Sequence, residues 1–244
     1  MAAHAGPDGC GTLYGIGVGP GDPELLTLKA HRLIRAAPVI AYPAPTEGES
    51  FTRRIVAPYL DEMDKEEIQI RMPMRADRFP AQEVYDWASG EVGGHLRAGR
   101  DVAYLCQGDP FFYGSFMYLY SRMAGEFRVE VVPGVSSIMA GSASLGAALA
   151  SRNDTLIVLP GPMGAEEMKA RLEWADAAVI IKVGGHFEKI YGVLAEAGLL
   201  SQSRYIERAT LESQRTLPLD EVDPEGVPYF SMILVHKRGQ AWNL

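Results

Sequence analysis

The sequence predicts an α/β fold made of two domains. Residues 13–18 and 39–42 are short apolar runs, and between them lie a glycine-rich loop and a helical pattern, which together indicate a parallel βαβ unit. Apolar strand patterns continue to alternate with helical patterns through the first half of the chain. The composition then changes, because residues 135–150 are mainly Ser, Ala and Gly. We therefore expect domains at 1–134 and 135–244.

The first helix has a well-marked beginning. Asp22 can accept hydrogen bonds from the free N–H groups of the first turn, Pro23 has the φ that a first helical position needs, and Glu24 complements the positive end of the helix dipole. Apolar residues then recur three, four and seven apart from Leu25 onwards. The pattern predicts a helix that ends before Pro38.

The other elements follow from the same patterns. In the first domain, further strands are predicted at 67–72, 101–107 and 127–132, and helices at 50–60, 80–98 and 115–124. In the second domain, strands are predicted at 155–159, 177–183, 204–209 and 229–237, and helices at 135–150, 165–175 and 187–197. The proline-containing stretch 211–228 is predicted to be an extended connection or a hairpin.

Composition and charge limit the classes of function. The 244 residues, 47% of them hydrophobic, are enough for one large or two modest domains. A net charge of −8 disfavours a nucleic-acid-binding surface, and the acidic run at 62–67 is interpreted as a solvated face. No apolar run approaches the roughly 18 residues of a membrane-spanning helix. Since Cys10 and Cys106 are far apart and no signal peptide is seen, we expect a reduced, cytoplasmic protein without a membrane or nucleic-acid partner.

Several common kinds of site lack their sequence motifs. The five histidines form no HExxH pair and the cysteines form no CxxC pair, so we expect no metal site. There is also no GxSxG motif for a nucleophilic serine. Ser136 and Ser137 follow Pro133-Gly134, where a serine is ordinarily a helix cap.

The glycine-rich loop allows more than one interpretation. Glycines at alternate positions from Gly15 to Gly21 let a ligand approach the backbone just before a helix. A phosphate-binding loop, however, has Lys followed by Ser or Thr at the helix start, where this chain has Asp22-Pro23. A dinucleotide fingerprint also fits poorly, because Pro20 and Asp22 replace the usual residues and put a negative charge where a pyrophosphate would sit. Taken alone, the loop is best interpreted as a turn that connects strand and helix.

Three motifs resemble those of a known family. They are GIGVGPGDPELLTLKA followed by VIAYP, then LCQGDPFFYGS, then VVPGVSS. In this order and spacing they resemble the signatures of the tetrapyrrole methylases, which methylate corrin and sirohaem precursors with S-adenosylmethionine. The similarity covers nearly the whole chain from Thr12. Within the family, the runs DTLIVLPG, VIIKVG and VPYFSMILV resemble the branch that methylates carbon 20 of precorrin-2.

The resemblance implies a fold, a cofactor and a substrate. The implied fold has an N-terminal α/β domain with a mostly parallel five-stranded sheet, a C-terminal α/β domain with a mixed sheet, and a cofactor cleft between them. The implied cofactor is S-adenosyl-L-methionine, with S-adenosyl-L-homocysteine as the product, and the implied substrate is a tetrapyrrole. A homodimer is implied as well, and the small-residue helix at 135–150 is suited to close packing.

The resemblance also implies individual site residues. The cofactor-binding positions are Pro20, Gln107, Gly108, Asp109, Phe112, Ser136, Ser137, Val183 and Ala209. The substrate-binding positions in the first loop are Gly19, Gly21 and Asp22. Because guanidinium groups pair well with the carboxylates of a tetrapyrrole, further candidates for substrate binding are Arg53, Arg54, Arg71, Arg75 and Arg78. No general acid or base is predicted, since methyl transfer mainly requires that the reactants are aligned.

The residue after Tyr42 bears on the position that is methylated. In the uroporphyrinogen-methylating branch of the family, the corresponding tyrosine is followed by an aspartate that is thought to handle a proton, whereas this chain has Pro43, which cannot ionise. We therefore expect methylation of carbon 20 of precorrin-2 to give precorrin-3A in cobalamin biosynthesis. The cobalt-containing substrate is one alternative, and a noncatalytic tetrapyrrole-binding protein is another. An RNA methyltransferase is disfavoured by the acidic charge.

Overall fold

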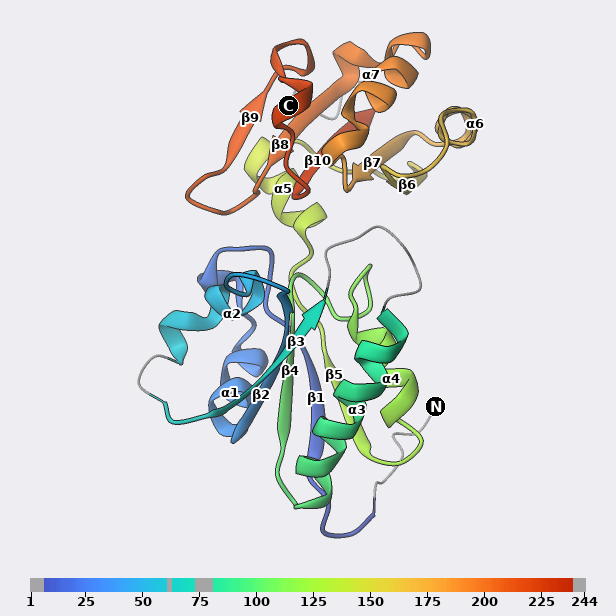
Figure 1. Ribbon diagram of the computed structural model, residues 1–244. Helices are drawn as coiled ribbons and strands as arrows, with labels where there is room; N and C mark the ends of the chain where they lie inside the picture. The colour runs from blue at the N-terminus through green and yellow to red at the C-terminus, as the bar shows by residue number, and fades with distance from the viewer. Residues whose placement is uncertain (1–6, 61–62, 73–80, 239–244) are drawn as a thin grey trace. The chain divides into compact units, whose positions relative to one another are not determined.

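The protein consists of two compact units, each built on one β-sheet, which confirms the α/β prediction. The structure is a computed structural model that describes residues 7–60, 63–72 and 81–238. The first unit is Met1–Ser136 and the second is Ser137–Leu244. Figure 1 shows the helices and strands of each unit.

The sheet of the first unit is parallel. Its strands are β1 (Thr12–Gly17), β2 (Val39–Pro45), β3 (Glu66–Met72), β4 (Val102–Cys106) and β5 (Arg128–Val132). They lie in the order β3-β2-β4-β1-β5, and each neighbouring pair runs in the same direction. β4 is buried along its whole length, as its continuous apolar run predicts for a central parallel strand.

Helices cover both faces of this sheet (Figure 1). They are α1 (Leu28–Ala36), α2 (Phe51–Val56), α3 (Ala81–Arg97) and α4 (Phe116–Met123). Successive residues of a strand point to opposite faces, so α1 and α2 pack on one face and α3 and α4 on the other. In β4, for example, Leu105 shares a hydrophobic cluster with Ile34 of α1, whereas Tyr104 lies against Phe116 of α4.

The first helix begins later than predicted. Asp22 does act as a cap, since its Oδ1 accepts a hydrogen bond from the N–H of Glu24 at 2.8 Å, but it caps only a 3₁₀ turn at Pro23–Leu25. The chain then becomes extended, and Thr27 caps α1 by accepting a hydrogen bond from the N–H of Ala30 at 3.1 Å. A second cap so close to the first therefore divides the predicted helix in two.

The sheet of the second unit is mixed, as predicted. Its strands are β6 (Leu156–Pro160), β7 (Ala177–Ile181), β8 (Ser203–Glu207), β9 (Arg215–Leu217) and β10 (Ser231–His236). They lie in the order β6-β7-β10-β8-β9. β6 is parallel to β7, and β10 is antiparallel to both β7 and β8, so β6, β7 and β8 all point the same way. β9 pairs antiparallel with β8 and lies in the stretch that was predicted to be an extended connection or a hairpin.

Three helices pack on this second sheet. α6 (Ala165–Trp174) and α7 (Phe187–Glu196) cover one face, and α5 (Ser137–Leu145) covers the other. The small residues of α5 let it approach the sheet closely, because a Cβ on Gly141 would lie only 2.8 Å from Sδ of Met232 in β10. The close packing for which this helix is suited is therefore used inside the unit.

Candidate functional site

The carboxyl ends of the strands in the first sheet form an edge where ligands can bind. From β1 the chain passes to β2, which lies beyond β4, and from β4 it passes to β5, which lies beyond β1. The two connections leave in opposite directions, so the border between β1 and β4 is a topological switch point. Ligands of open α/β sheets bind outside the carboxyl ends of the strands at such a point. The loops after β1 and β4 are therefore the first candidate site.

Gly19 and Gly108 join these two loops. The N–H of Gly108 donates to the carbonyl of Gly19 at 2.7 Å, and the N–H of Gly19 donates to the carbonyl of Gly108 at 3.3 Å. Their φ angles are +82° and +66°, which glycine adopts without steric strain. A Cβ placed on Gly108 would meet no described atom within 4 Å. There is open space beside this residue, and a ligand can approach its backbone.

The loop after β5 packs against the first two loops. A Cβ on Gly134 would overlap the carbonyl oxygen of Gly108, and a Cβ on Gly17 would lie 2.5 Å from the backbone nitrogen of Gly134. Side chains therefore do not fit where these loops meet. We call the three contacting segments, residues 17–19, 108–109 and 134, the glycine clasp.

Asp109 ties the clasp together through backbone N–H groups. Its Oδ2 accepts a hydrogen bond from the N–H of Gly134 at 3.1 Å. Its Oδ1 accepts hydrogen bonds from the N–H groups of Phe111 and Phe112 at 2.9 and 3.1 Å. The carboxylate thus shapes the turn after β4, while the ring of Phe112 is 41% exposed and accessible to a ligand.

Other predicted site positions flank the clasp in the sequence. Pro20 and Gly21 are buried directly after Gly19, and Gln107 is half-buried directly before the turn. Ser136 and Ser137 are half-buried where the chain enters α5, with Ser137 as the first helical residue.

Arg53, a predicted substrate-binding residue, is paired within the chain. Its Nε lies 3.1 and 3.2 Å from the two carboxylate oxygens of Glu67, and the hydroxyl of Tyr42 donates to Oε2 of Glu67 at 2.5 Å. Burial raises the pKa of Tyr42 to about 12, and the hydrogen bond to Glu67 and its negative charge act in the same direction. Glu67 is exposed, as expected for the solvated acidic face, and it also links β3 to β2 and α2.

Arg71 holds the end of β2 and the residue after it. Its NH1 donates to the carbonyls of Pro45 and Thr46 at 3.2 and 3.1 Å, and its NH2 donates to Oε1 of Gln69 at 2.7 Å. Because its guanidinium is used in this way, Arg71 fixes the backbone at the carboxyl edge of the sheet.

The other predicted arginines are Arg54, Arg75 and Arg78. The guanidinium of Arg54 lies 5.3 Å from the ring centroid of Phe51, and the residue is exposed. Arg54 is therefore accessible to a carboxylate in solution. Arg75 and Arg78 lie outside the described residues.

Hydrogen bonding between β2 and β4 stops before the carboxyl edge. β2 pairs with β4 only from Val39 to Ala41, whereas it pairs with β3 as far as Pro45. Pro43 and Pro45 have no N–H to donate to a neighbouring strand. The hydroxyl of Ser50 donates to the carbonyl of Pro43 at 2.6 Å and helps to hold this segment.

In the second unit, the predicted residues Val183 and Ala209 also lie at one edge of the sheet. They follow β7 and β8, which point the same way, and both side chains are buried. Their neighbours Lys182, Arg208 and Thr210 have φ angles of 58°, 50° and 69°. Left-handed backbone is unfavourable for residues other than glycine and is enriched at functional sites. This edge is the second candidate site, and sequence reasoning missed the three strained residues because no Gly or Asn marks them.

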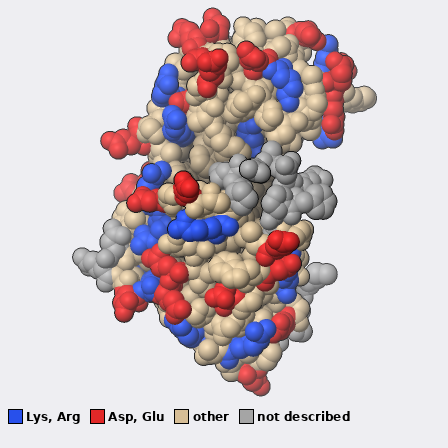
Figure 2. Space-filling model, in the orientation of Figure 1, with Lys and Arg blue, Asp and Glu red and all other residues tan. Residues whose placement is uncertain are grey.

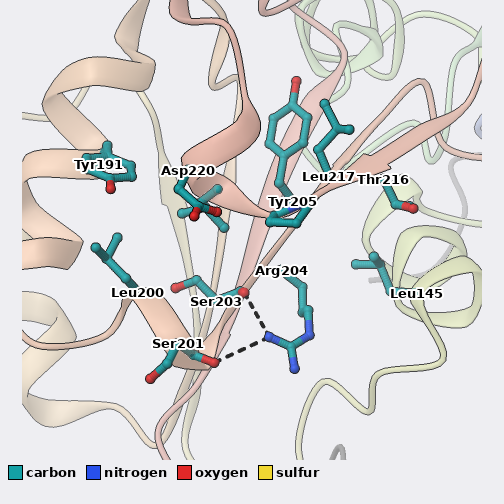
Figure 3. A pocket seen from close by; sticks show the side chains of 12 residues that line it. Leu145, Tyr191, Leu200, Ser201, Ser203, Arg204, Tyr205, Thr216, Leu217 and Asp220 are labelled. Carbon is teal, nitrogen blue, oxygen red and sulfur yellow. Dashed lines mark hydrogen bonds between the residues drawn. The ribbon is translucent and has the colours of Figure 1, made fainter.

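A hollow of about 570 Å³ lies elsewhere in the second unit (Figure 3). Its walls include Tyr191 of α7, Tyr205 in the middle of β8, and residues of β9. Arg204 donates to the carbonyls of Ser201 and Ser203 at 3.3 and 3.1 Å along one wall. Of the predicted site residues that the structure describes, none lines this hollow.

The charged side chains of the face drawn in Figure 2 are mixed in sign. Acidic and basic groups are interspersed over its described part. Within residues 7–60, 63–72 and 81–238, no helix is both long enough and apolar enough to cross a membrane. In the same ranges, no group of three or more His, Cys, Asp and Glu residues could hold a metal ion.

Comparison with known proteins defines the family. The model of the Tetrapyrrole (Corrin/Porphyrin) Methylases matches residues 12–223. The precorrin-2 C(20)-methyltransferase of Sinorhizobium sp is 42% identical over 236 residues, which are 93% of this chain and 96% of that protein. The cobalt-precorrin-2 C(20)-methyltransferase of Salmonella typhimurium is 32% identical over 231 residues, which are 93% of this chain and 97% of that protein. The chain belongs to the tetrapyrrole methylase family, as its motifs predict.

Solved structures of related methyltransferases are similar as well, and one of them contains a ligand. It is the uroporphyrin-III C-methyl transferase from Thermus thermophilus in complex with S-adenyl homocysteine, with a TM-score of 0.67, 26% identity, and coverage of 92% of this chain and 97% of that chain. Other relatives are longer than this chain. The chain spans 46% of the cobalamin biosynthesis protein CobIJ of Mycobacterium tuberculosis, to which it is 41% identical over 92% of its own length.

Proposed function

We propose that the protein transfers a methyl group from S-adenosyl-L-methionine to carbon 20 of precorrin-2, giving precorrin-3A in cobalamin biosynthesis. The observation that carries this proposal is the 42% identity, over almost the full length of both chains, to the Sinorhizobium protein of that name. Membership of the family and the similarity to a structure in complex with S-adenyl homocysteine support the choice of cofactor.

The residues at the two candidate sites fit this cofactor. The open space beside Gly108 lets a ligand lie against the backbone, and the exposed ring of Phe112 offers an apolar surface. We propose cofactor-binding roles for the residues that the resemblance implies: Pro20, Gln107, Gly108, Asp109, Phe112, Ser136, Ser137, Val183 and Ala209. Asp109 contributes by shaping the loop, because its carboxylate already accepts three backbone hydrogen bonds.

The role of the chain in catalysis is to position the reactants. When bound, the cofactor supplies a methyl group on a sulfonium, which is already a strong electrophile. The Gly19–Gly108 hydrogen bonds and the Asp109 carboxylate fix the loops before a ligand arrives, so binding need not order them. Alignment of this kind supplies roughly 7–11 kcal/mol in favourable cases. No general base is assigned.

Substrate binding requires cationic groups on a chain whose net charge is −8. We propose that Arg54 meets substrate carboxylates directly, because this residue is exposed. Arg53 and Arg71 act instead by holding Glu67 and the end of β2. Gly19, Gly21 and Asp22 remain candidates for contact with the macrocycle, and Arg75 remains a prediction from the sequence.

The test is turnover with labelled S-adenosylmethionine and either precorrin-2 or its cobalt-containing form. Mass spectrometry should show one added methyl group on precorrin-2. Faster conversion of the cobalt form would favour the second candidate, which the Salmonella relative supports. Binding of both compounds without any methylated product would contradict an enzymatic role and favour a tetrapyrrole-binding protein.

We also propose that the protein acts as a homodimer in the cytoplasm, as the family resemblance implies. Gly141 of α5 packs on Met232 within one unit, whereas Ala143 and Ser144 of the same helix are exposed and remain available for packing against a second chain. Sedimentation at micromolar concentration should give twice the chain mass of 26.6 kDa, and a species of 26.6 kDa would contradict the dimer.

A further inference from the structure

We propose that Glu207 is a positioning residue that holds the strained turn after β8 and thereby fixes Ala209 where the cofactor binds. This inference rests on the proposed function, because Ala209 is one of the proposed cofactor-binding residues. The turn consists of residues 208–210 and begins the loop from β8 to β9.

The backbone of the turn is strained on both sides of Ala209. Arg208 has a φ of 50° and Thr210 has a φ of 69°. In this region the Cβ of an L-residue crowds its own backbone, and a β-branched residue such as threonine is a clear outlier. Such a conformation persists only where surrounding contacts hold it in place. The turn therefore needs anchors on both sides.

Glu207 is the charged anchor. It is the last residue of β8, and its side chain is only 4% exposed. Its Oε1 lies 2.9 Å from NH1 of Arg208 and 3.6 Å from NH1 of Arg215, and its Oε2 accepts a hydrogen bond from the hydroxyl of Tyr205 at 2.7 Å. Both oxygens of the buried carboxylate are thus satisfied. Arg208 lies in the turn and Arg215 begins β9, so one carboxylate contacts residues at both ends of the loop.

Backbone hydrogen bonds complete the turn. The N–H of Arg208 donates to the carbonyl of Phe230 at 2.7 Å, and the N–H of Thr210 donates to Oε1 of Gln214 at 2.7 Å. Ala209, between them, is 7% exposed and packs in the hydrophobic cluster under α5. The salt bridge to Glu207 is therefore the contact that holds the side chain of Arg208 against the sheet.

The test is the substitution Glu207→Gln, with S-adenosyl-L-homocysteine as the probe. Glutamine keeps the size of the side chain and can still accept the hydrogen bond from Tyr205, but it loses the charge that holds the two arginines. Their side chains are 36% and 61% exposed, so water can solvate them and the unit can stay folded. We expect the Kd measured by titration calorimetry to rise at least tenfold. The amides of residues 208–211 should also exchange with solvent faster than in the wild type.

Asp154→Asn is the matched control. The side chain of Asp154 is buried, like that of Glu207. Its Oδ2 lies 3.1 Å from Nε2 of His236, and its Oδ1 lies 3.0 Å from NH1 of Arg238. It precedes β6, so it lies at the opposite edge of the sheet from the turn. This variant should lose stability but bind the probe like the wild type. Glu207→Asp, which keeps the charge on a shorter side chain, should recover part of the affinity lost in Glu207→Gln.

Three outcomes overturn the inference. The first is a folded Glu207→Gln protein with wild-type affinity, which leaves the proposed function intact. The second is an equal loss of affinity in Asp154→Asn, since the effect would then be one of general stability. The third is a wild-type protein that does not bind the probe at all, which removes the proposed function together with this inference.

Discussion

Asp109 fixes a loop that lies 25 residues further along the chain, because its Oδ2 is 3.1 Å from the N–H of Gly134. One carboxylate after β4 thereby sets the position of the chain after β5. Together with the hydrogen bonds between Gly19 and Gly108, it makes three separate loops behave as one rigid edge.

Gly134→Ala should destabilise the first unit. The added methyl group would overlap the carbonyl oxygen of Gly108, and overpacking of a tight contact costs typically about 1–3 kcal/mol. Urea denaturation measures the change in the free energy of unfolding. Gly192→Ala is the control, because it lies inside α7 and its Cβ would meet no described atom within 4 Å. That variant should gain about 0.5–1 kcal/mol.

Gly108→Asn should weaken cofactor binding while the protein stays folded. Asparagine tolerates the left-handed backbone at φ +66°, but its side chain would occupy the open space beside the clasp. Valine is unsuitable here, because a β-branched residue is strained at this φ even without a ligand. We expect a Kd for S-adenosyl-L-homocysteine at least tenfold higher than in the wild type. Unchanged affinity in a folded variant would remove Gly108 from the site.

Stability should fall in acid partly because of Asp154. The pKa of Asp154 is lowered mainly by the hydrogen bonds that it accepts from the backbone N–H and the hydroxyl of Ser151. The charge of Arg238 and the hydrogen bond with His236 act in the same direction. A carboxyl group whose pKa is lower in the folded protein stabilises the fold at pH values above its pKa in the unfolded chain, which is about 3.9. This stabilisation is lost as the pH falls through the pKa of the folded protein. Urea midpoints measured downward from about pH 5 should therefore drop less for Asp154→Asn than for the wild type. Equal slopes for the two proteins would contradict the assignment.

Uroporphyrinogen III should be a poor substrate. Pro43 cannot exchange a proton, and its carbonyl already accepts a hydrogen bond from the hydroxyl of Ser50 at 2.6 Å. A missing general acid or base lowers a rate by roughly 10²–10⁴. We expect kcat/KM for uroporphyrinogen III to be lower than for precorrin-2 by a factor in that range. Comparable values for the two substrates would show that the residue after Tyr42 does not decide the position of methylation.

The sequence predicted the strands well because their signal is local. The apolar run at 101–107 contains the whole of β4, for example, and burial on both faces accounts for its composition. The first helix was predicted less well. Leu28 lies three residues after Leu25 and so belongs to the predicted apolar pattern, yet it is 89% exposed, since Thr27 starts a new helix with a different register. In the sequence, two capping residues in succession give the same pattern as one helix with a polar residue inside it.

The loops of the site could be predicted, but their contacts could not. Motifs at Gly19 and Gly108 located the edge, whereas the pairing of Arg53 with Glu67 joins a helix to a strand 14 residues away and leaves no local pattern. The left-handed backbone at Lys182, Arg208 and Thr210 is also invisible in the sequence, because these residue types do not favour it. Tertiary contacts impose that conformation.

The position of β1 in its sheet has a consequence for the growing chain. β1 is made before the other strands of its sheet, yet its partners are β4, which begins at Val102, and β5, which begins at Arg128. Because synthesis proceeds from the amino terminus, an apolar strand waits unpaired at the ribosome while some ninety further residues are added. Until then, β2 and β3 are the strands that can pair. The loop after β1 therefore takes its final shape only once Gly134, which packs against Gly17, has emerged from the ribosome.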